Sequence, residues 1–403
     1  MGPKLRRFLS NVALGLASSV LVLLVLEGAA RLSLRGRGGG KEEQTTALYT
    51  EYDPVLGWRK KAGAQASFHR REYDVDVAIN SHGLRGPERD YAAPPDAVRV
   101  LTLGDSFVEG QGVPTEATAT ALLEPLLSVP GCRAEGVNGG TIGYSTDQEY
   151  LFYTEEGRKY APRAVVLFLY YNDVVFTTSE WYYGRPKPVL TFPPGGVPGV
   201  KAPAPFTPKP RDAAAAADEE PRGSALFGWV RDRLKRGAPR TYDALAALGL
   251  WPRIRVISPP RELFVYRKDP PQFVIRAWDE TGAILGALRA RVEADGGHLM
   301  VAYVPSRMEV ADRDWELTQI TYGLKEGDWE RGLVRQRLVA LGRSGGFPVL
   351  DLTPPLRRED RGALGGPYYV HDGHWNAVGQ RVAAREVAGF LKAQAWLGAC
   401  ASR

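Results

Sequence analysis

The chain has 403 residues, of which 44% are hydrophobic and 24% are charged. These are ordinary proportions for a globular protein, and they exclude collagen-like, coiled-coil and wholly disordered classes. Lysine and arginine outnumber aspartate and glutamate by 52 to 46, for a net charge of +6. This excess is mild over such a length, so we expect no nucleic-acid partner. The length allows two or three domains, or one domain with large insertions.

The N-terminus carries the segment Phe8–Leu26, which has no charged residue and follows Lys4, Arg6 and Arg7. As a helix it would be about 28 Å long, close to the thickness of a bilayer core. We interpret it as an uncleaved transmembrane helix. A cleaved signal peptide, with a weak site at Gly28-Ala29-Ala30, and a buried soluble helix are the alternatives.

Basic residues flank both ends of this segment almost equally, so the positive-inside rule does not decide its orientation. The N-terminal position favours a single-pass signal-anchor with the rest of the chain outside the cytoplasm, in the periplasm or the extracellular space. Arg35–Gly40 would then be a tether.

The alternating segment Tyr73–Ile79 and the turn residues Asn80–Gly83 predict a β-hairpin ahead of the main domain. Short apolar strands then alternate with helices, which indicates a mainly parallel sheet covered on both faces. The expected strands are 98–103, 134–138, 164–170, 298–304 and 348–352. The expected helices lie near 117–128, 146–159, 272–294, 328–342 and 377–393.

We therefore predict an α/β fold: a flavodoxin-like three-layer α/β/α domain with five strands, preceded by a transmembrane helix and a small β element.

Between Val174 and Pro271 the pattern is interrupted by a Pro-rich loop at 185–223, which includes Ala213–Ala217. An amphipathic helix at Ser224–Arg236 follows, either packing on its own domain or acting as a lid or membrane-touching helix. The predicted parts are an anchor and tether (1–45), a lead-in (46–95), a main domain (96–176 and 272–395) and an insertion (177–271).

Four strands of the predicted sheet are followed by residues suited to nucleophilic catalysis. Gly104-Asp105-Ser106 follows the first strand, where the N-terminus of a helix would place backbone N–H groups beside the hydroxyl. Gly143 lies in a glycine-rich loop after the second strand, and Asn172 follows the third. Each of these taken alone is equally typical of a helix cap or a turn.

His371-Asp372-Gly373-His374 follows the fifth strand, and a carboxylate near an imidazole can orient it as the base of a nucleophile. A metal pair at His371 and His374 is the alternative, but too few further ligands are evident, so we expect no metal and no cofactor. A phosphate loop at 104–112 is excluded by its spacing. Parallel strands end at the same edge of a sheet, so we expect all four stretches to meet there.

These motifs resemble the SGNH (GDSL-like) hydrolase superfamily, with Gly104-Asp105-Ser106 in the first block and Gly143, Asn172 and Asp372/His374 in the others. Gly57-Trp58 and Asn80–Gly86 resemble an element of its membrane-anchored bacterial members. The resemblance implies Ser106 as nucleophile, His374 as base and Asp372 as its orienting carboxylate. It also implies an oxyanion hole made by the backbone N–H groups of Ser106 and Gly143 and the Asn172 side chain.

This sequence departs from the family at two points. One residue separates Asp372 from His374 where many members have two, and no glycine precedes Asn172. The spacing leaves open whether His371 or His374 faces Ser106, so His371, with Asp105, is an alternative base or supporting residue.

The resemblance predicts a serine esterase acting on an ester-bearing small molecule or an acylated glycan. The alternatives are an O-acyltransferase acting on a cell-envelope polysaccharide, and a non-catalytic polysaccharide-binding protein on the same scaffold. Cys132 and Cys400 are predicted at the same edge of the sheet, where an oxidising compartment would allow a disulfide; two free thiols are the alternative.

Overall fold

A sheet of five parallel strands forms the centre of the computed structural model, which describes residues 3–34, 48–182, 184–192, 198–206, 224–249, 251–362 and 365–401. The strands are β5 (Ala97–Leu103), β6 (Arg133–Asn138), β7 (Ala164–Tyr170), β12 (His298–Val304) and β13 (Val349–Asp351). Each lies within one residue of its predicted bounds. The α/β class and the parallel sheet are therefore confirmed.

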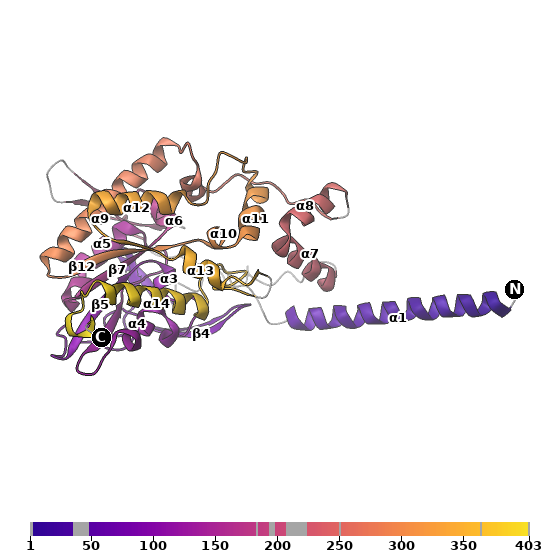
Figure 1. Cartoon of the computed structure of the whole chain (residues 1–403), viewed down its shortest axis with the longest axis horizontal. Coiled ribbons are helices and arrows are strands. Elements are labelled where there is room, and N and C mark those ends of the chain that lie inside the picture. The colour runs from indigo at the N-terminus through magenta and orange to yellow at the C-terminus, as the bar shows by residue number, and fades with distance from the viewer. Residues whose placement is uncertain are drawn as a thin grey trace.

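Helices cover both faces of this sheet and make the three layers visible in Figure 1. One face carries α5 (Thr146–Glu155), α9 (Gln272–Ala294) and α12 (Leu333–Gly345), and the other carries α4 (Ala119–Leu127) and α14 (Ala377–Ala393). The strands are apolar on both faces: Leu101 and Leu167 pack toward the first layer, and Val100 and Val166 toward the second. A strand buried on both sides reads as a continuous apolar run, which is why the sequence pattern located all five.

The strand order β13-β12-β7-β5-β6 is the flavodoxin-like order. The chain leaves β5 toward one side of the sheet to reach β6, and then returns to form β7 on the other side of β5. The loops after β5 and β7 therefore diverge at the carboxyl edge of the sheet, which opens a crevice between them.

Shorter elements complete the described part of the chain. The remaining helices are α3 (Ser106–Glu109), α6 (Tyr171–Phe176), α7 (Ala225–Gly237), α8 (Pro239–Ala247), α10 (Arg307–Val310), α11 (Asp312–Tyr322) and α13 (Thr353–Glu359). The 3-10 turns are η1 (Thr115–Ala117), η2 (Gly157–Tyr160), η4 (Arg261–Tyr266) and η6 (Gly398–Ala401).

The lead-in forms two hairpins, β1 (Thr50–Asp53) with β2 (Gly57–Lys60), and β3 (Gln65–His69) with β4 (Asp74–Ala78). The expected strand is present as β4, which pairs with β3 across the turn 70–73. The predicted turn Asn80–Gly83 also reverses the chain, and it brings Ile79 into an antiparallel bridge with Arg85. In this turn, Gly83 donates its N–H to the Asn80 carbonyl at 3.0 Å. Because polar turn residues stand at both ends of this strand, the sequence pattern does not show at which end it is joined to its partner strand.

The Pro-rich stretch predicted as loop contains strands. β8 (Trp181–Tyr182) pairs with β9 (Arg185–Pro186), and β10 (Val189–Thr191) pairs with β11 (Gly199–Lys201). Strands this short leave no periodic signal in a sequence. The run Ala213–Ala217 lies outside the described residues.

The N-terminal helix α1 (Pro3–Leu34) extends away from the rest of the molecule, with the N-terminus at its far end (Figure 1). Its segment Ser10–Leu32 is long and apolar enough to cross a membrane, and none of it is buried against the protein. The chain thus has one apolar helix near its N-terminus that suits an anchor or a signal sequence. The predicted tether Arg35–Gly40 lies outside the described residues.

A disulfide joins Cys132, immediately before β6, to Cys400 in η6, with a Cα–Cα distance of 5.3 Å. It ties the C-terminus of the chain, just after α14, to the amino edge of the sheet. Cross-linking residues that are far apart in sequence stabilises the folded state mainly by restricting the unfolded chain.

We expect Cys132→Ser combined with Cys400→Ser to lower the free energy of unfolding by about 2–5 kcal/mol. Denaturant titration of the oxidised protein measures the loss. The matched control is the unmodified protein in excess reductant, which should unfold at the same denaturant concentration as the double variant. Equal stability of the oxidised protein and the double variant would show that the bond contributes nothing.

Candidate active site

Ser106 lies at a sharp turn between β5 and α3. Gly104 has φ of +155°, and a Cβ there would come within 2.4 Å of the Val108 side chain and 3.3 Å of the Phe168 carbonyl oxygen. The next residue, Asp105, caps α3 by accepting the Phe107 N–H at 2.9 Å. Glycine is needed at this turn because any side chain would collide with the first turn of the helix. The turn leaves Ser106 as the first helical residue at the carboxyl edge of the sheet.

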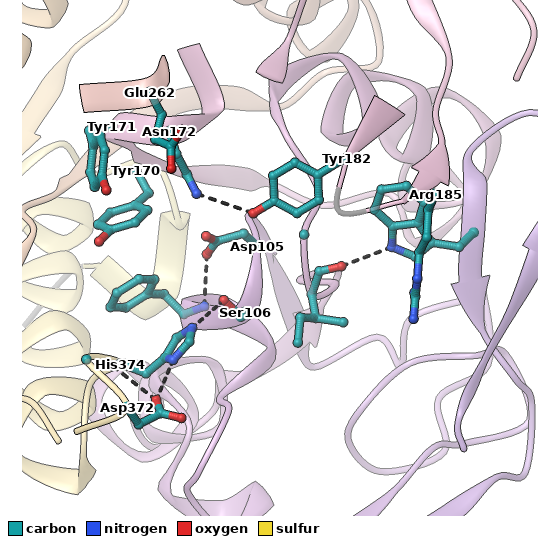
Figure 2. A pocket seen from close by; sticks show the side chains of 15 residues that line it. Asp105, Ser106, Tyr170, Tyr171, Asn172, Tyr182, Arg185, Glu262, Asp372 and His374 are labelled. Atoms are coloured by element: carbon teal, nitrogen blue, oxygen red, sulfur yellow. Dashed lines mark hydrogen bonds and ion pairs between the residues drawn. The ribbon is translucent and has the colours of Figure 1, made fainter. Parts of the chain in front are cut away.

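Ser106, His374 and Asp372 form a continuous chain of hydrogen bonds (Figure 2). The Ser106 Oγ lies 2.7 Å from His374 Nε2, and His374 Nδ1 lies 2.5 Å from Asp372 Oδ1. The backbone N–H of His374 also donates to Asp372 Oδ1, at 3.2 Å. A carboxylate on Nδ1 holds the imidazole in the tautomer that leaves Nε2 free to accept a proton from the serine.

Burial alone would raise the pKa of Asp372. The hydrogen bond and the charge of His374, with a hydrogen bond from Tyr73, outweigh this effect and lower that pKa to about 2. The carboxylate therefore stays ionised through the whole range in which an imidazole titrates, so it can stabilise an imidazolium.

The sequence left open which of two histidines faces Ser106. In the structure His374 lies beside Ser106, and His371 does not. The His371 side chain is exposed and lines a separate hollow near α7 and α10. Asp105 lies in the wall of the Ser106 pocket but serves as the helix cap described above. Burial raises the pKa of Asp105 to about 6.

Gly143 and Asn172, the expected oxyanion donors, line the same pocket as Ser106. Gly143 has φ of +75°, and a Cβ there would come within 2.8 Å of the Tyr182 ring. The Asn172 amide nitrogen lies 3.4 Å from the Tyr182 hydroxyl and points into the pocket (Figure 2). All four motif stretches predicted to converge are thus brought to one cavity.

This pocket has a volume of about 370 Å³ and a largely aromatic wall. Trp58 comes from the lead-in, Tyr170 and Tyr171 from the end of β7, and Tyr182 and Arg185 from the segment between α6 and α7. The Trp58 and Tyr182 rings stack, with centroids 6.4 Å apart. Tyr182 and Arg185 could not be found from the sequence, because they belong to strands of two residues without any motif.

The lead-in also supports the glycine-rich loop. Trp58 Nε1 donates to the Ile142 carbonyl at 3.0 Å, and the Tyr144 hydroxyl donates to the Trp58 carbonyl at 2.6 Å. The buried Lys60 ammonium donates to the Gly140 carbonyl, and burial lowers the pKa of Lys60 to about 8. Gly57-Trp58 therefore fixes the loop that carries Gly143.

The turn of the β3–β4 hairpin holds the loop that carries Asp372. The Glu72 carboxylate accepts the backbone N–H groups of Val370 at 2.7 Å, His371 at 2.7 Å and Asp372 at 2.9 Å. The Tyr73 hydroxyl donates to Asp372 Oδ2 at 3.0 Å. Nothing in the sequence indicated this role, since Glu72 and Tyr73 lie about 300 residues before their partners.

Three further buried carboxyl groups, Asp147, Glu149 and Asp173, interact electrostatically with one another, and Glu149 and Asp173 also interact with Asp105 in the pocket wall. Burial and then the charge of Asp105 raise the pKa of Glu149 well above its ordinary value, and burial and then Glu149 do the same for Asp173. Protonated groups add little negative charge beneath a site that would hold an oxyanion. Lys187, from the segment between α6 and α7, forms a fully buried ion pair with Asp147.

A family model described as "SGNH hydrolase-like domain, acetyltransferase AlgX" matches residues 266–402, which include Asp372 and His374 but not Ser106. No curated protein matches significantly.

Among solved structures, TesA aligns with 13% identity and a TM-score of 0.36, over 73% of this chain and 98% of its own. An acetylxylan esterase from Geobacillus stearothermophilus aligns with 12% identity and a TM-score of 0.36, over 75% and 94% of the two chains. A lipase/acylhydrolase from Enterococcus faecalis aligns with 10% identity and a TM-score of 0.36, over 74% and 96%.

We expect Glu72→Ala to lower kcat for ester cleavage by up to about 100-fold with little change in KM, because the loop carrying Asp372 loses three hydrogen bonds and a misplacement of about 1 Å can cost that much. Steady-state kinetics on short acyl esters measures the effect. Glu88→Ala is the matched control, since Glu88 accepts a backbone N–H and a hydroxyl of Ser81 in the same lead-in. Equal kinetics of the two variants would contradict the positioning role.

We expect Lys187→Met to lower the free energy of unfolding by about 3–5 kcal/mol at neutral pH, because Asp147 is left buried without its cation. Burial then raises the folded-state pKa of Asp147 further above its unfolded value. The folded variant therefore binds more protons than the unfolded chain, and its deficit should shrink as the pH falls toward the raised pKa. Denaturant titrations across pH measure this, with Lys187→Met/Asp147→Asn as the control that removes the dependence. A deficit independent of pH would contradict this account.

Proposed function

We propose that this chain is a serine esterase of the SGNH hydrolase superfamily, with Ser106 as nucleophile, His374 as base and Asp372 as orienting carboxylate. The observation that carries the proposal is the hydrogen-bonded chain of these three side chains at the mouth of an aromatic pocket. A serine is a weak nucleophile until a base takes its proton, and this base is in hydrogen-bonding distance at 2.7 Å.

In the first half of the reaction, the Ser106 Oγ attacks the ester carbonyl carbon while His374 Nε2 takes the hydroxyl proton. The carbonyl oxygen becomes an oxyanion, and Asp372 stabilises the imidazolium. The donors for the oxyanion are the N–H groups of Ser106 and Gly143 and the Asn172 amide. Such donors are worth most when they are fixed before the reaction begins, and the support of the glycine loop by Trp58 supplies this.

In the second half, the intermediate collapses and the C–O bond to the leaving alkoxide breaks. His374 returns its proton to the leaving oxygen, and an acyl-Ser106 ester remains. Water then attacks this ester while His374 Nε2 takes a proton from it. The bond between the acyl carbon and Ser106 Oγ breaks, His374 returns the proton to Ser106 Oγ, and the carboxylic acid leaves. These reaction steps conserve protons and need no cofactor.

We place the catalytic domain outside the cytoplasm, with α1 as a single-pass anchor. Two features support this placement. The segment Ser10–Leu32 is exposed and apolar, and the Cys132–Cys400 disulfide is typical of oxidising compartments.

Acyl transfer to a sugar hydroxyl of a cell-envelope polysaccharide is the second candidate function. It uses the same acyl-Ser106 intermediate with a different acceptor. The description of the matching family model and the aromatic pocket wall, which suits a sugar ring, both favour it. A non-catalytic polysaccharide-binding protein is favoured less, because binding alone does not require the aligned Ser106, His374 and Asp372.

We expect Ser106→Ala to reduce kcat for short acyl esters on the order of 10⁴-fold or more, because it removes the hydroxyl that is hydrogen-bonded to His374. Hydrolysis by the purified protein measures this. Ser344→Ala is the matched control, since this exposed serine at the end of α12 is remote from the pocket. Hydrolysis that persists in Ser106→Ala would end the assignment.

Product analysis with an acyl donor and a soluble glycan acceptor distinguishes hydrolysis from transfer. An esterase releases free acid at a rate that the glycan does not change. A transferase forms acylated glycan at the expense of free acid, and Tyr182→Ala should reduce that share if the aromatic wall holds the acceptor. Absence of both products would leave the non-catalytic reading.

A further inference from the structure

Helix α7 carries an apolar stripe that is exposed on the outside of the molecule. Leu226, Phe227, Val230 and Leu234 share one helical face by their spacing. Phe227 is 48% exposed and Val230 is 40% exposed. The opposite face includes Ala225, which is buried, and Asp232 and Arg236, which line a hollow against the catalytic domain. The stripe therefore faces away from that hollow, with Leu226 and Leu234 half-buried and the Phe227 ring packed on Trp251 at a centroid distance of 4.8 Å.

The start of α7 is attached to α1. The Glu27 carboxylate accepts hydrogen bonds from the Ser224 hydroxyl at 2.7 Å and from the backbone N–H groups of Ala225 at 2.8 Å and Leu226 at 2.9 Å. Glu27 belongs to the last turns of the apolar segment Ser10–Leu32. In Figure 1, α7 lies beside this end of α1 and runs across its direction. A bilayer crossed by α1 would therefore have α7 lying along its surface.

The composition around the stripe suits the surface of an anionic bilayer. Exposed large apolar side chains gather in this part of the chain, at Phe227, Trp229, Val230, Leu248, Val256 and Ile257. Basic residues lie among them in the sequence, at Arg231, Arg233, Lys235, Arg236, Arg240, Arg253 and Arg255, against the acidic Asp232 and Asp243. Arg236 pairs with Asp232 and Arg240 with Glu316. Aromatic and apolar side chains flanked by arginine and lysine are the composition of helices that lie in the headgroup region.

We propose that α7 is an interfacial helix, which inserts the stripe of Leu226, Phe227, Val230 and Leu234 into the headgroup region of the membrane and binds anionic lipid through its basic residues. This rests on the proposed role of α1 as a membrane anchor. The far end of α7 contacts the loop that carries Asp372, because Arg236 donates to the Val370 carbonyl at 3.2 Å, two residues before Asp372. The helix would thus hold the pocket at a fixed height above the membrane surface.

The test uses the full chain in vesicles of phosphatidylglycerol and phosphatidylcholine in equal parts, with phosphatidylcholine alone as the second arm. Both native cysteines are bonded to each other, so one introduced cysteine can carry a polarity-sensitive fluorophore. The variants are Val230→Cys in the stripe, Leu126→Cys on α4 as the exposed control, and Val20→Cys in α1 as the reporter of the anchor. Lipid-attached quenchers at shallow and deep positions report depth.

We expect the Val230 label to emit at shorter wavelength than the Leu126 label and to be quenched from the shallow position, more strongly with phosphatidylglycerol. The Val20 label should be quenched from the deep position. A water-exposed Val230 label beside a deep Val20 label overturns the interfacial helix and leaves the anchor intact. A shielded Val230 label that no lipid quencher reaches shows a protein partner, such as a second copy, and also overturns it. A water-exposed Val20 label refutes the anchor and the interfacial helix together, while ester hydrolysis tests the catalytic proposal independently.

Discussion

The ionised state of Asp372 is the constraint on which the candidate site depends. A carboxylate that is largely withdrawn from water tends to take up a proton, and a protonated Asp372 could not stabilise an imidazolium at His374. The structure opposes this tendency with hydrogen bonds from His374 and Tyr73. Without them, the imidazole of His374 would not be held in the orientation in which it contacts Ser106.

This arrangement explains why segments outside the sheet belong to the site. The loop carrying Asp372 has no regular structure of its own, and Glu72 satisfies three of its backbone N–H groups from the β3–β4 hairpin. The glycine loop is held in the same way by Trp58 and Lys60 of β2. The lead-in is therefore a support for both halves of the site, and its removal would leave each loop with unpaired backbone groups.

Burial acts in the opposite way on two other carboxyl groups near the pocket: it keeps them protonated, whereas Asp372 is kept ionised. An oxyanion forms most easily where little negative charge is already present, and burial favours protonated Glu149 and Asp173 behind the site. Asp147 is balanced by Lys187, which comes from the segment between α6 and α7. That segment also supplies Tyr182 and Arg185 to the pocket wall. It thus contributes both to the stability of the domain and to the surface that a substrate would meet.

The sequence by itself determined the α/β class, the five strands and the edge of the sheet at which Ser106, Gly143, Asn172 and His374 meet. It could do so because buried parallel strands are continuous apolar runs, and because parallel strands bring the residues that follow them to one edge. Only the tertiary structure decided that His374 rather than His371 faces Ser106, since both lie within one short loop whose path depends on Glu72. The same holds for Tyr73, Tyr182 and Lys187, which act through partners distant in the chain and leave no local pattern. The pairing of β4 with β3 was likewise decided by the tertiary structure, because β4 has turn residues at both ends and the choice of partner strand is a matter of packing.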